Sequence, residues 1–232
     1  MNKIIAAALL IIAFASCRDA NVEPPGVEVF EWNFEKDAEG WAGNFADYPS
    51  GDAEFYMLFF SWETLPSPLH TTQGALLLTG SNRSDDLFMY ATRRVTGLVP
   101  ATVYNLSFTV EFASDVPDNM VGIGGSPGES VYVKVGATTE EPGREIDDMG
   151  WFRMDIDKGN QSQDGLNMIV VGDFSNDTDN EEYTLKRVMN DNQGFSVLSN
   201  DAGEIWITVG TDSGFEGATT IYYNSIRVEM FY

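Results

Sequence analysis

The glycine-rich stretch GGSPG, residues 124–128, has the GxSxG spacing of a serine nucleophile elbow. Such an elbow builds part of its oxyanion hole from the backbone N–H of the residue after the serine. That residue is Pro127, which has no N–H to donate. The sole histidine, His70, also precedes the serine, whereas the triad order of such enzymes requires it to follow. We therefore interpret this stretch as a glycine-rich loop and not as a nucleophile site.

A second stretch with catalytic residue types is EIDDMG, residues 145–150, which resembles the EIDxxE strand of certain jelly-roll glycoside hydrolases. Their chemistry needs two carboxylates about 5 Å apart, one acting as nucleophile and the other as acid. Glu145 and Asp147 would share one face of a strand, but Gly150 stands at the position of the acid. No other complete acid/base set is found, so the sequence predicts a protein that is not an enzyme.

Metal chemistry is restricted by composition, because the chain has one histidine and one cysteine. A zinc site of nitrogen and sulfur ligands therefore cannot be assembled, and oxygen ligands favour Ca²⁺. The stretch DIDKGNQ, residues 155–161, has the DxDxG start of some calcium loops. It lacks the terminal glutamate of an EF-hand loop, so it is weak evidence for a site.

Aromatic residues on the polar phase of strands suggest a surface for sugar stacking. Trp206 and Tyr132 alternate with Val and Ile residues, so a period of two directs both rings away from the core. Trp41 and Trp151 lie in expected loops and complete the candidate ligand-binding set. The alternative for each ring is structural packing under a loop.

The single cysteine, Cys17, follows an apolar run from Ile4 to Phe14 that begins after Lys3. This layout is typical of a secretory signal, and the run is too short to span a membrane. The sequence FASC, residues 14–17, resembles the lipobox of bacterial lipoproteins, in which the cysteine is acylated and becomes the first mature residue. We expect residues 1–16 to be a signal peptide, and residues 17–26 to be the acylated cysteine with a proline-containing linker.

Charge excludes one class of partner. The formal net charge is −23, and the removal of Lys3 with the signal would make it more negative. A field of this sign disfavours binding to nucleic acid, and the pair Arg93-Arg94 is too small a basic cluster to reverse it. Neutral ligands such as glycans, and divalent cations, remain compatible with the charge.

The apolar pattern predicts strands from end to end. Apolar and polar residues alternate over 104–112, 131–135 and 205–209, and further strand-like runs cover 29–34, 75–79, 87–95, 168–172 and 221–231. Residues 182–189 are compatible with a short helix or a strand. We predict an all-β protein, an antiparallel β-sandwich of the jelly-roll type, forming a single domain with long loops over residues 27–232.

Three stretches together resemble the jelly-roll carbohydrate-binding modules with a galactose-binding-like sandwich: FEKDAEGW (34–41), GLVPATVYNLSF (97–108) and IYYNSIRVE (221–229). The central stretch also resembles the tyrosine corner of fibronectin type III domains, which covers less of the chain. The module resemblance implies glycan binding and a structural calcium between the first and last strands. By position, its ligands would be Glu35 and Asn224.

These observations lead to an expected function. The first hypothesis is a lipoprotein anchored at Cys17 in the bacterial cell envelope, with the outer membrane favoured, whose sandwich binds a glycan. The alternative is a structural or accessory lipoprotein that binds another envelope protein. A glycoside hydrolase is the least favoured, because its acid is missing.

Overall fold

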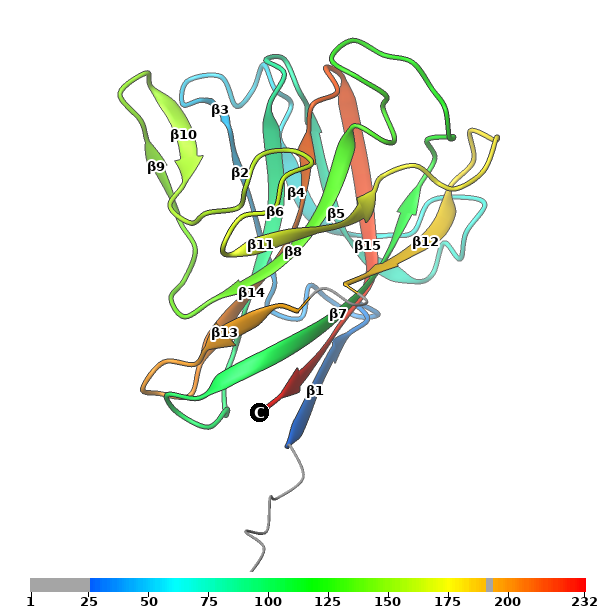
Figure 1. Ribbon diagram of the computed structural model, residues 1–232. Helices are drawn as coiled ribbons and strands as arrows, with labels where there is room; N and C mark the ends of the chain where they lie inside the picture. Colours follow the sequence, from blue (N-terminus) through cyan, green and yellow to red (C-terminus); the bar gives the residue numbers. More distant parts are fainter. Residues whose placement is uncertain (1–25, 191–193) are drawn as a thin grey trace, which may run out of the picture.

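The computed structural model describes residues 26–190 and 194–232, and the regular elements in these ranges are all β-strands (Figure 1). The described residues contain no helix long and apolar enough to cross a membrane. In chain order the strands are β1 (Val27–Trp32), β2 (Ala42–Ala46), β3 (Tyr48–Pro49), β4 (Phe59–Thr64), β5 (Gly74–Ser81), β6 (Leu87–Val95), β7 (Val103–Ser114), β8 (Val131–Thr138), β9 (Arg144–Ile146), β10 (Trp151–Met154), β11 (Met168–Asp173), β12 (Thr184–Met189), β13 (Ser196–Leu198), β14 (Ile205–Ser213) and β15 (Ala218–Phe231).

Two antiparallel sheets form the sandwich. One has seven strands in the order β12–β7–β15–β5–β4, with β1 pairing with β15 and β13 pairing with β7. The other has five strands in the order β11–β8–β14–β6–β2. A small third sheet, β3–β10–β9, lies beside them. The predicted all-β antiparallel sandwich is confirmed.

The connectivity is that of a jelly roll. The order β5–β15–β7–β12 in one sheet faces the order β6–β14–β8–β11 in the other. Along these strands the chain therefore changes sheet between β5 and β6, β6 and β7, β7 and β8, β11 and β12, β13 and β14, and β14 and β15. This double Greek-key path is the arrangement expected of a jelly roll.

Alternation along the strands explains which side chains fill the core. On β7 every second side chain is buried between the two sheets. These side chains pack in one core with the inward-facing side chains of β8, β14 and β15. Residues 182–189, which were compatible with helix or strand, contain strand β12. The buried set includes Tyr104, Leu106, Phe108, Val110, Phe112, Val133, Val135, Ile207, Val209, Ile226 and Val228.

Tyr104 also forms the corner that its sequence context predicted. Its ring is fully buried, and its hydroxyl accepts a hydrogen bond of 2.8 Å from the backbone N–H of Val99. The loop before β7 is thereby tied to the strand that follows it, as in a tyrosine corner. The corner is compatible with a jelly roll and does not require a fibronectin fold.

The outer face of the five-stranded sheet is covered by the protein's own chain. Residues 155–167, here called the covering segment, run between β10 and β11 across this sheet (Figure 1). Ile156 and Met154 pack against Phe88 and Tyr90, which project from the outer side of β6. This segment brings polar groups onto a face that would otherwise be open to solvent.

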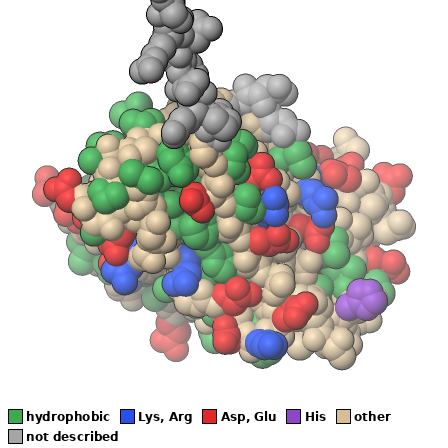
Figure 2. All heavy atoms as spheres, turned by 90° about the horizontal axis from the view of Figure 1, so that it is seen from below, with side chains coloured by type: hydrophobic (Ala, Val, Ile, Leu, Met, Phe, Trp, Pro, Cys, Tyr) green, Lys and Arg blue, Asp and Glu red, His purple; other side chains and the backbone are tan. Residues whose placement is uncertain are grey.

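The view from below shows acidic side chains spread over the surface, with basic side chains lying among them (Figure 2). This mixture agrees with a net charge of −23 carried by residues spread over the whole chain. On the face in view, basic side chains form no continuous patch of the kind that nucleic acid requires.

Candidate functional site

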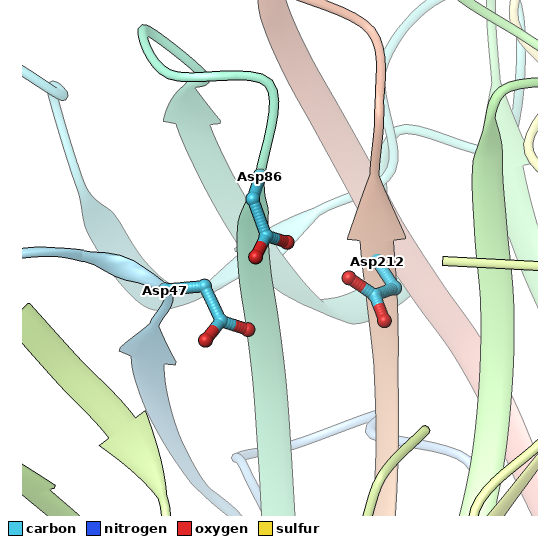
Figure 3. Close-up of side chains that lie close together, drawn as sticks. All are labelled: Asp47, Asp86 and Asp212. Atoms are coloured by element: carbon cyan, nitrogen blue, oxygen red, sulfur yellow. The ribbon is translucent and has the colours of Figure 1, made fainter. Parts of the chain in front are cut away.

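Three aspartates converge at the outer face of the five-stranded sheet (Figure 3). Asp47 follows β2, Asp86 directly precedes β6, and Asp212 lies near the end of β14. One carboxylate oxygen of each lies within 4.8 Å of those of the other two. The three meet because β2, β6 and β14 are neighbours in the sheet, although they are far apart along the chain.

Two lysines neutralise part of this acidic cluster. The Nζ of Lys158, in the covering segment, lies 2.9 Å from Oδ2 of Asp47 and 2.9 Å from Oδ2 of Asp212. The Nζ of Lys134, on β8, lies 3.0 Å from the same oxygen of Asp212. The Lys134 and Asp212 side chains are 0 % exposed. Both charges of that ion pair are therefore removed from water.

Arg153 supplies the third positive charge. Its Nη1 lies 2.8 Å from Oδ1 of Asp47 and 3.4 Å from Oδ2 of Asp86. Its Nε lies 3.2 Å from Oδ2 of Asp147, in the stretch that resembled a glycosidase strand. The guanidinium also lies 5.1 Å from the ring centroid of Trp151, two residues earlier on β10. Arg153 therefore connects the aspartates to a half-buried aromatic ring.

The environment shifts the pKa values of this network in different directions. Burial, followed by the charges of Asp47 and Asp212, raises the pKa of Asp86 to about 7. Burial lowers the pKa of the Lys134 amine, and the nearby Asp212 only partly offsets that effect. Burial also acts to lower the pKa of Lys158, but Asp212 and Asp47 outweigh it and the pKa lies above its ordinary value. The site therefore places a carboxyl group with a raised pKa beside two further aspartates and two lysines.

The three carboxylates have the oxygen chemistry that could hold a metal ion such as Ca²⁺. Lys158 already places a positive charge between Asp47 and Asp212, in contact with an oxygen of each. A divalent cation would have to displace that ammonium, because the two would compete for the same oxygens. In the described arrangement, Lys158 is the cation of the cluster.

A cavity of about 210 Å³ opens beside these charges. We call it the aspartate pocket. Its lining is mostly polar, and it combines carboxylates, an ammonium, a guanidinium, an amide and backbone groups. The lining residues are Asp47, Asp86, Arg153, Met154, Ile156, Asp157, Lys158, Gly159 and Asn160.

Trp206 and Tyr132 point away from the core, as their strand phase predicted, but they do not form one platform. Tyr132 pairs with Asp212 in the register of β8 and β14, and Trp206 lies six residues earlier on β14. At about 3.3 Å per residue, they are separated by roughly 20 Å along the sheet. Between them the face is covered, and Lys134 in that stretch is fully buried. Both rings are half-buried, and binding by either one stays a prediction.

Trp41 is a core residue, which corrects its place among the candidate ligand-binding rings. Its side chain is only 4 % exposed, and its ring packs edge-on against Trp32 at 5.2 Å between centroids. A sugar cannot stack on a ring that is enclosed in this way. Trp151 does not itself line the aspartate pocket, but its ring contacts Arg153, which does.

Glu35 and Asn224 are not joined by a hydrogen bond in the part of the chain that the structure describes. Glu35 is exposed in the loop after β1. Asn224 lies at an irregularity in β15, and its Nδ2 donates a hydrogen bond of 2.7 Å to Oε1 of Glu111. Its Oδ1 is buried without a hydrogen-bond partner. Calcium at this pair stays a prediction, and Cys17 lies outside the described residues.

Sequence reasoning missed most of the pocket, although it examined two of the stretches that build it. DIDKGNQ, residues 155–161, supplies Lys158 and was considered only as a calcium loop. EIDDMG, residues 145–150, supplies Asp147, the partner of Arg153. The signal that could have been followed was the lysine itself, since a lysine among closely spaced aspartates predicts an ion-paired network.

No family model and no curated protein sequence matches the chain. Among solved structures it is similar to the CBM22-1 xylan-binding domain of Paenibacillus barcinonensis Xyn10C, with 8 % identity, a TM-score of 0.40, and coverage of 90 % of this chain and 97 % of that one. A mannan-recognising carbohydrate-binding module, TmCBM27, has 12 % identity and a TM-score of 0.35, with coverage of 88 % and 98 %.

The enzymatically active domain of bacteriophage CBA120 tailspike protein 4 is also similar, with 12 % identity and a TM-score of 0.36 over 84 % of this chain. The match covers 20 % of that protein, so this chain spans about a fifth of its length. The similarities to β-sandwich carbohydrate-binding modules and to the tailspike are distant.

Proposed function

We propose that the protein is a non-catalytic glycan-binding lipoprotein of the cell envelope, and that its binding site is the aspartate pocket. The observation that carries this proposal is the pairing of a polar cavity with an aromatic ring. Asp47 and Asp86 line the cavity, and Arg153 links it to the half-buried Trp151. Sites for small ligands combine apolar surface with a few convergent polar groups in this way.

The donors and acceptors of the pocket match sugar hydroxyl groups. A hydroxyl donates to a carboxylate oxygen and accepts from an N–H, and the pocket offers both kinds of partner. Asp47, Asp86 and Asp157 supply carboxylate acceptors to the lining, and Lys158, Arg153 and Asn160 supply donors. The volume of about 210 Å³ is below the 300–1,000 Å³ of drug-sized sites, which favours one sugar residue at the end of a chain.

The charges of the pocket favour a neutral ligand and binding over hydrolysis. Lys158 and Arg153 lie against Asp47 at 2.9 and 2.8 Å, so the carboxylate is already neutralised within the protein. Two bound cations weaken a carboxylate as a nucleophile, whereas its remaining lone-pair sites can still accept hydrogen bonds. We therefore assign Asp47 and Asp86 to hydroxyl recognition and not to the roles of nucleophile and acid.

The alternative, a protein partner in the envelope, has one observation in its favour. Phe55, Met57 and Phe59 are exposed by 62 %, 65 % and 51 % in and beside the loop before β4. Apolar side chains at this exposure are compatible with a contact surface for another protein. Stoichiometric capture of an envelope protein, lost in Phe55→Ser, would favour this function over glycan binding.

The test is affinity electrophoresis of residues 18–232 in gels that contain a panel of neutral polysaccharides. We expect retardation in at least one gel, and loss of that retardation in Arg153→Met. The control is Arg94→Met, because Arg94 is 54 % exposed and forms only a long ion pair of 3.8 Å with Glu204. Unchanged migration of the wild type in every gel of the panel would contradict the proposal.

A further inference from the structure

Lys134 and Asp212 form a buried pair on adjacent strands of the five-stranded sheet. In the register of β8 and β14, Lys134 is opposite Gly210 and Asp212 is opposite Tyr132, so the two side chains are diagonal neighbours on one face. Nζ of Lys134 lies 3.0 Å from Oδ2 of Asp212, and both side chains are 0 % exposed. The pairing of the two strands holds amine and carboxyl group in contact and away from water.

The hydrogen bonds of Lys134 suit a neutral amine as well as an ammonium. Its Nζ donates to the backbone carbonyl of Lys158 at 2.8 Å and to that of Gln163 at 3.0 Å. A neutral amine has two N–H groups, and these two carbonyls accept both. The lone pair of the neutral amine would then take the remaining position on Nζ, which faces Asp212. Burial, which lowers the pKa of this amine, favours the same state.

The two oxygens of Asp212 have different surroundings. Oδ2 accepts a hydrogen bond of 2.9 Å from the backbone N–H of Gln161 and lies 2.9 Å from Nζ of Lys158. Donors placed in this way stabilise an oxygen that gains negative charge when a nucleophile adds to its carbon. Oδ1 is buried and has no hydrogen-bond partner. The two oxygens of Asp212 are therefore not equivalent, because donors surround Oδ2 but not Oδ1.

A carboxyl group that can carry protons lies beside this pair. The closest carboxylate oxygens of Asp86 and Asp212 are within 4.8 Å of each other, and Oδ1 of Asp86 is buried without a hydrogen-bond partner. Its Oδ2 faces Arg153 at 3.4 Å. Asp86 is therefore a carboxyl group close enough to Asp212 for a small side-chain movement to bring it into contact with the second oxygen of Asp212.

We propose that Lys134 and Asp212 join in an intramolecular isopeptide bond that links β8 to β14. The neutral Lys134 amine attacks Cγ of Asp212, and the new C–N bond forms while Oδ2 takes the negative charge. Nitrogen loses two protons in all, one when the ammonium becomes the neutral amine and one after the attack, and Asp86 passes each of them to Oδ1. The C–Oδ1 bond then breaks, and Oδ1 leaves as water. An ammonium and a carboxylate thus become one amide and one water, with no oxidant, reductant or further reactant.

The surrounding charges remain balanced after the bond forms. The cluster has three basic side chains, Lys134, Lys158 and Arg153, facing three aspartates. The bond removes one charge of each sign, so the net charge of the cluster does not change. Removal of a buried ion pair also removes the desolvation cost of its charges. Lys158 meets Asp212 at a similar distance, but it is shared between two carboxylates that keep it an ammonium.

Peptide mapping of the full-length protein tests the bond. Trypsin cleaves after lysine only when the side chain is free, so an unlinked chain releases residues 95–134, 135–144 and 188–227. We expect instead residues 95–144 joined to residues 188–227, with a mass lower by one water than the sum of the two peptides. Fragmentation should locate the link at Lys134 and Asp212.

Two variants control this experiment. Lys134→Arg keeps the positive charge but should yield an unlinked peptide 188–227. Asp86→Asn should fold, as checked by thermal melting, and should show most of its chain unlinked, because the amide cannot carry the proton. Recovery of unlinked peptides from the wild type, or a link that involves Lys158, would overturn the proposal. Complete linkage in Asp86→Asn would overturn the role of Asp86.

Discussion

The ammonium of Lys158 lies 2.9 Å from Oδ2 of Asp212, and the carboxylate it meets is completely buried. The lysine comes from the covering segment and the aspartate from the centre of the sheet, so this ion pair attaches the segment to the sandwich. The same ammonium contacts Asp47 at 2.9 Å, in the turn between β2 and β3. One positive charge therefore holds together three parts of the aspartate pocket.

Lys158→Met should destabilise the protein strongly. The substitution leaves Asp47 with Arg153 and Asp212 with Lys134 as the remaining cations. Complete loss of compensation for a buried charge costs about 3–5 kcal/mol, which is the upper bound here. Urea unfolding would measure the loss. Arg94→Ala, at an exposed ion pair, is the matched control and should cost less than about 1 kcal/mol. Equal small losses for both variants would mean that the Lys158 pair does not hold the segment.

Asp86 should make stability depend on pH. Its pKa is about 7 in the folded protein, because of burial and then the charges of Asp47 and Asp212, whereas its ordinary value is 3.8. The folded state therefore holds a proton that the unfolded state has lost, and this contribution to stability is complete below pH 3.8 and is lost as the pH rises through about 7.

Melting curves between pH 5 and pH 8 would measure this effect. The wild type should lose stability relative to Asp86→Asn as the pH rises over this range, because the asparagine variant does not titrate there. Lys158 and Arg153 act to lower the pKa of Asp86, and both remain in the variant as a common background. A constant difference between the two proteins would show that Asp86 has an ordinary pKa.

The strands were predictable from the sequence because strand alternation is a local property. The period over residues 104–112 identified the core side of β7, and the phase of residues 205–209 placed Trp206 on the outer side of β14. The covering segment was not predictable, because its position depends on contacts such as that of Lys134 with the carbonyl of Gln163. No periodic pattern within the segment reports which sheet face it covers.

Trp41 is a second residue whose surroundings could not be predicted from the sequence. Its loop position suggested exposure, but the ring is buried against Trp32, nine positions earlier in the sequence. Trp151 was proposed by the same reasoning and is half-buried, with its ring in contact with the pocket residue Arg153. Residue type alone could not distinguish these two tryptophans, since the difference is made by their neighbours in space.

Cys17→Ser should release the protein from membranes. The proposed anchor depends on the thiol, because only the cysteine can receive the lipid, and acyl chains contribute about 0.8 kcal/mol per buried methylene. Fractionation of cells that express the wild type or the variant would measure this. The wild type should sediment with the membranes and the variant should remain soluble. Equal membrane retention of the two proteins would contradict the anchor.

Structural calcium at Glu35 and Asn224 should be visible in thermal melting. If the pair binds Ca²⁺, chelation should lower the melting temperature of the wild type, because a ligand that binds only the folded state stabilises it. The double variant Glu35→Ala with Asn224→Ala should not respond to the chelator. Identical wild-type curves with and without chelator would exclude this site and would leave the glycan proposal untouched.

The most direct test of the glycan proposal compares two tryptophans on the same protein. Trp151 contacts Arg153 of the aspartate pocket, whereas Trp206 lies roughly 20 Å along the sheet from the Asp212 row. With a polysaccharide that retards the wild type in affinity gels, Trp151→Ala should weaken binding about tenfold, a loss of about 1.4 kcal/mol. Trp206→Ala should bind as the wild type does. Loss of binding in Trp206→Ala, with binding retained in Trp151→Ala, would contradict the pocket as the glycan site.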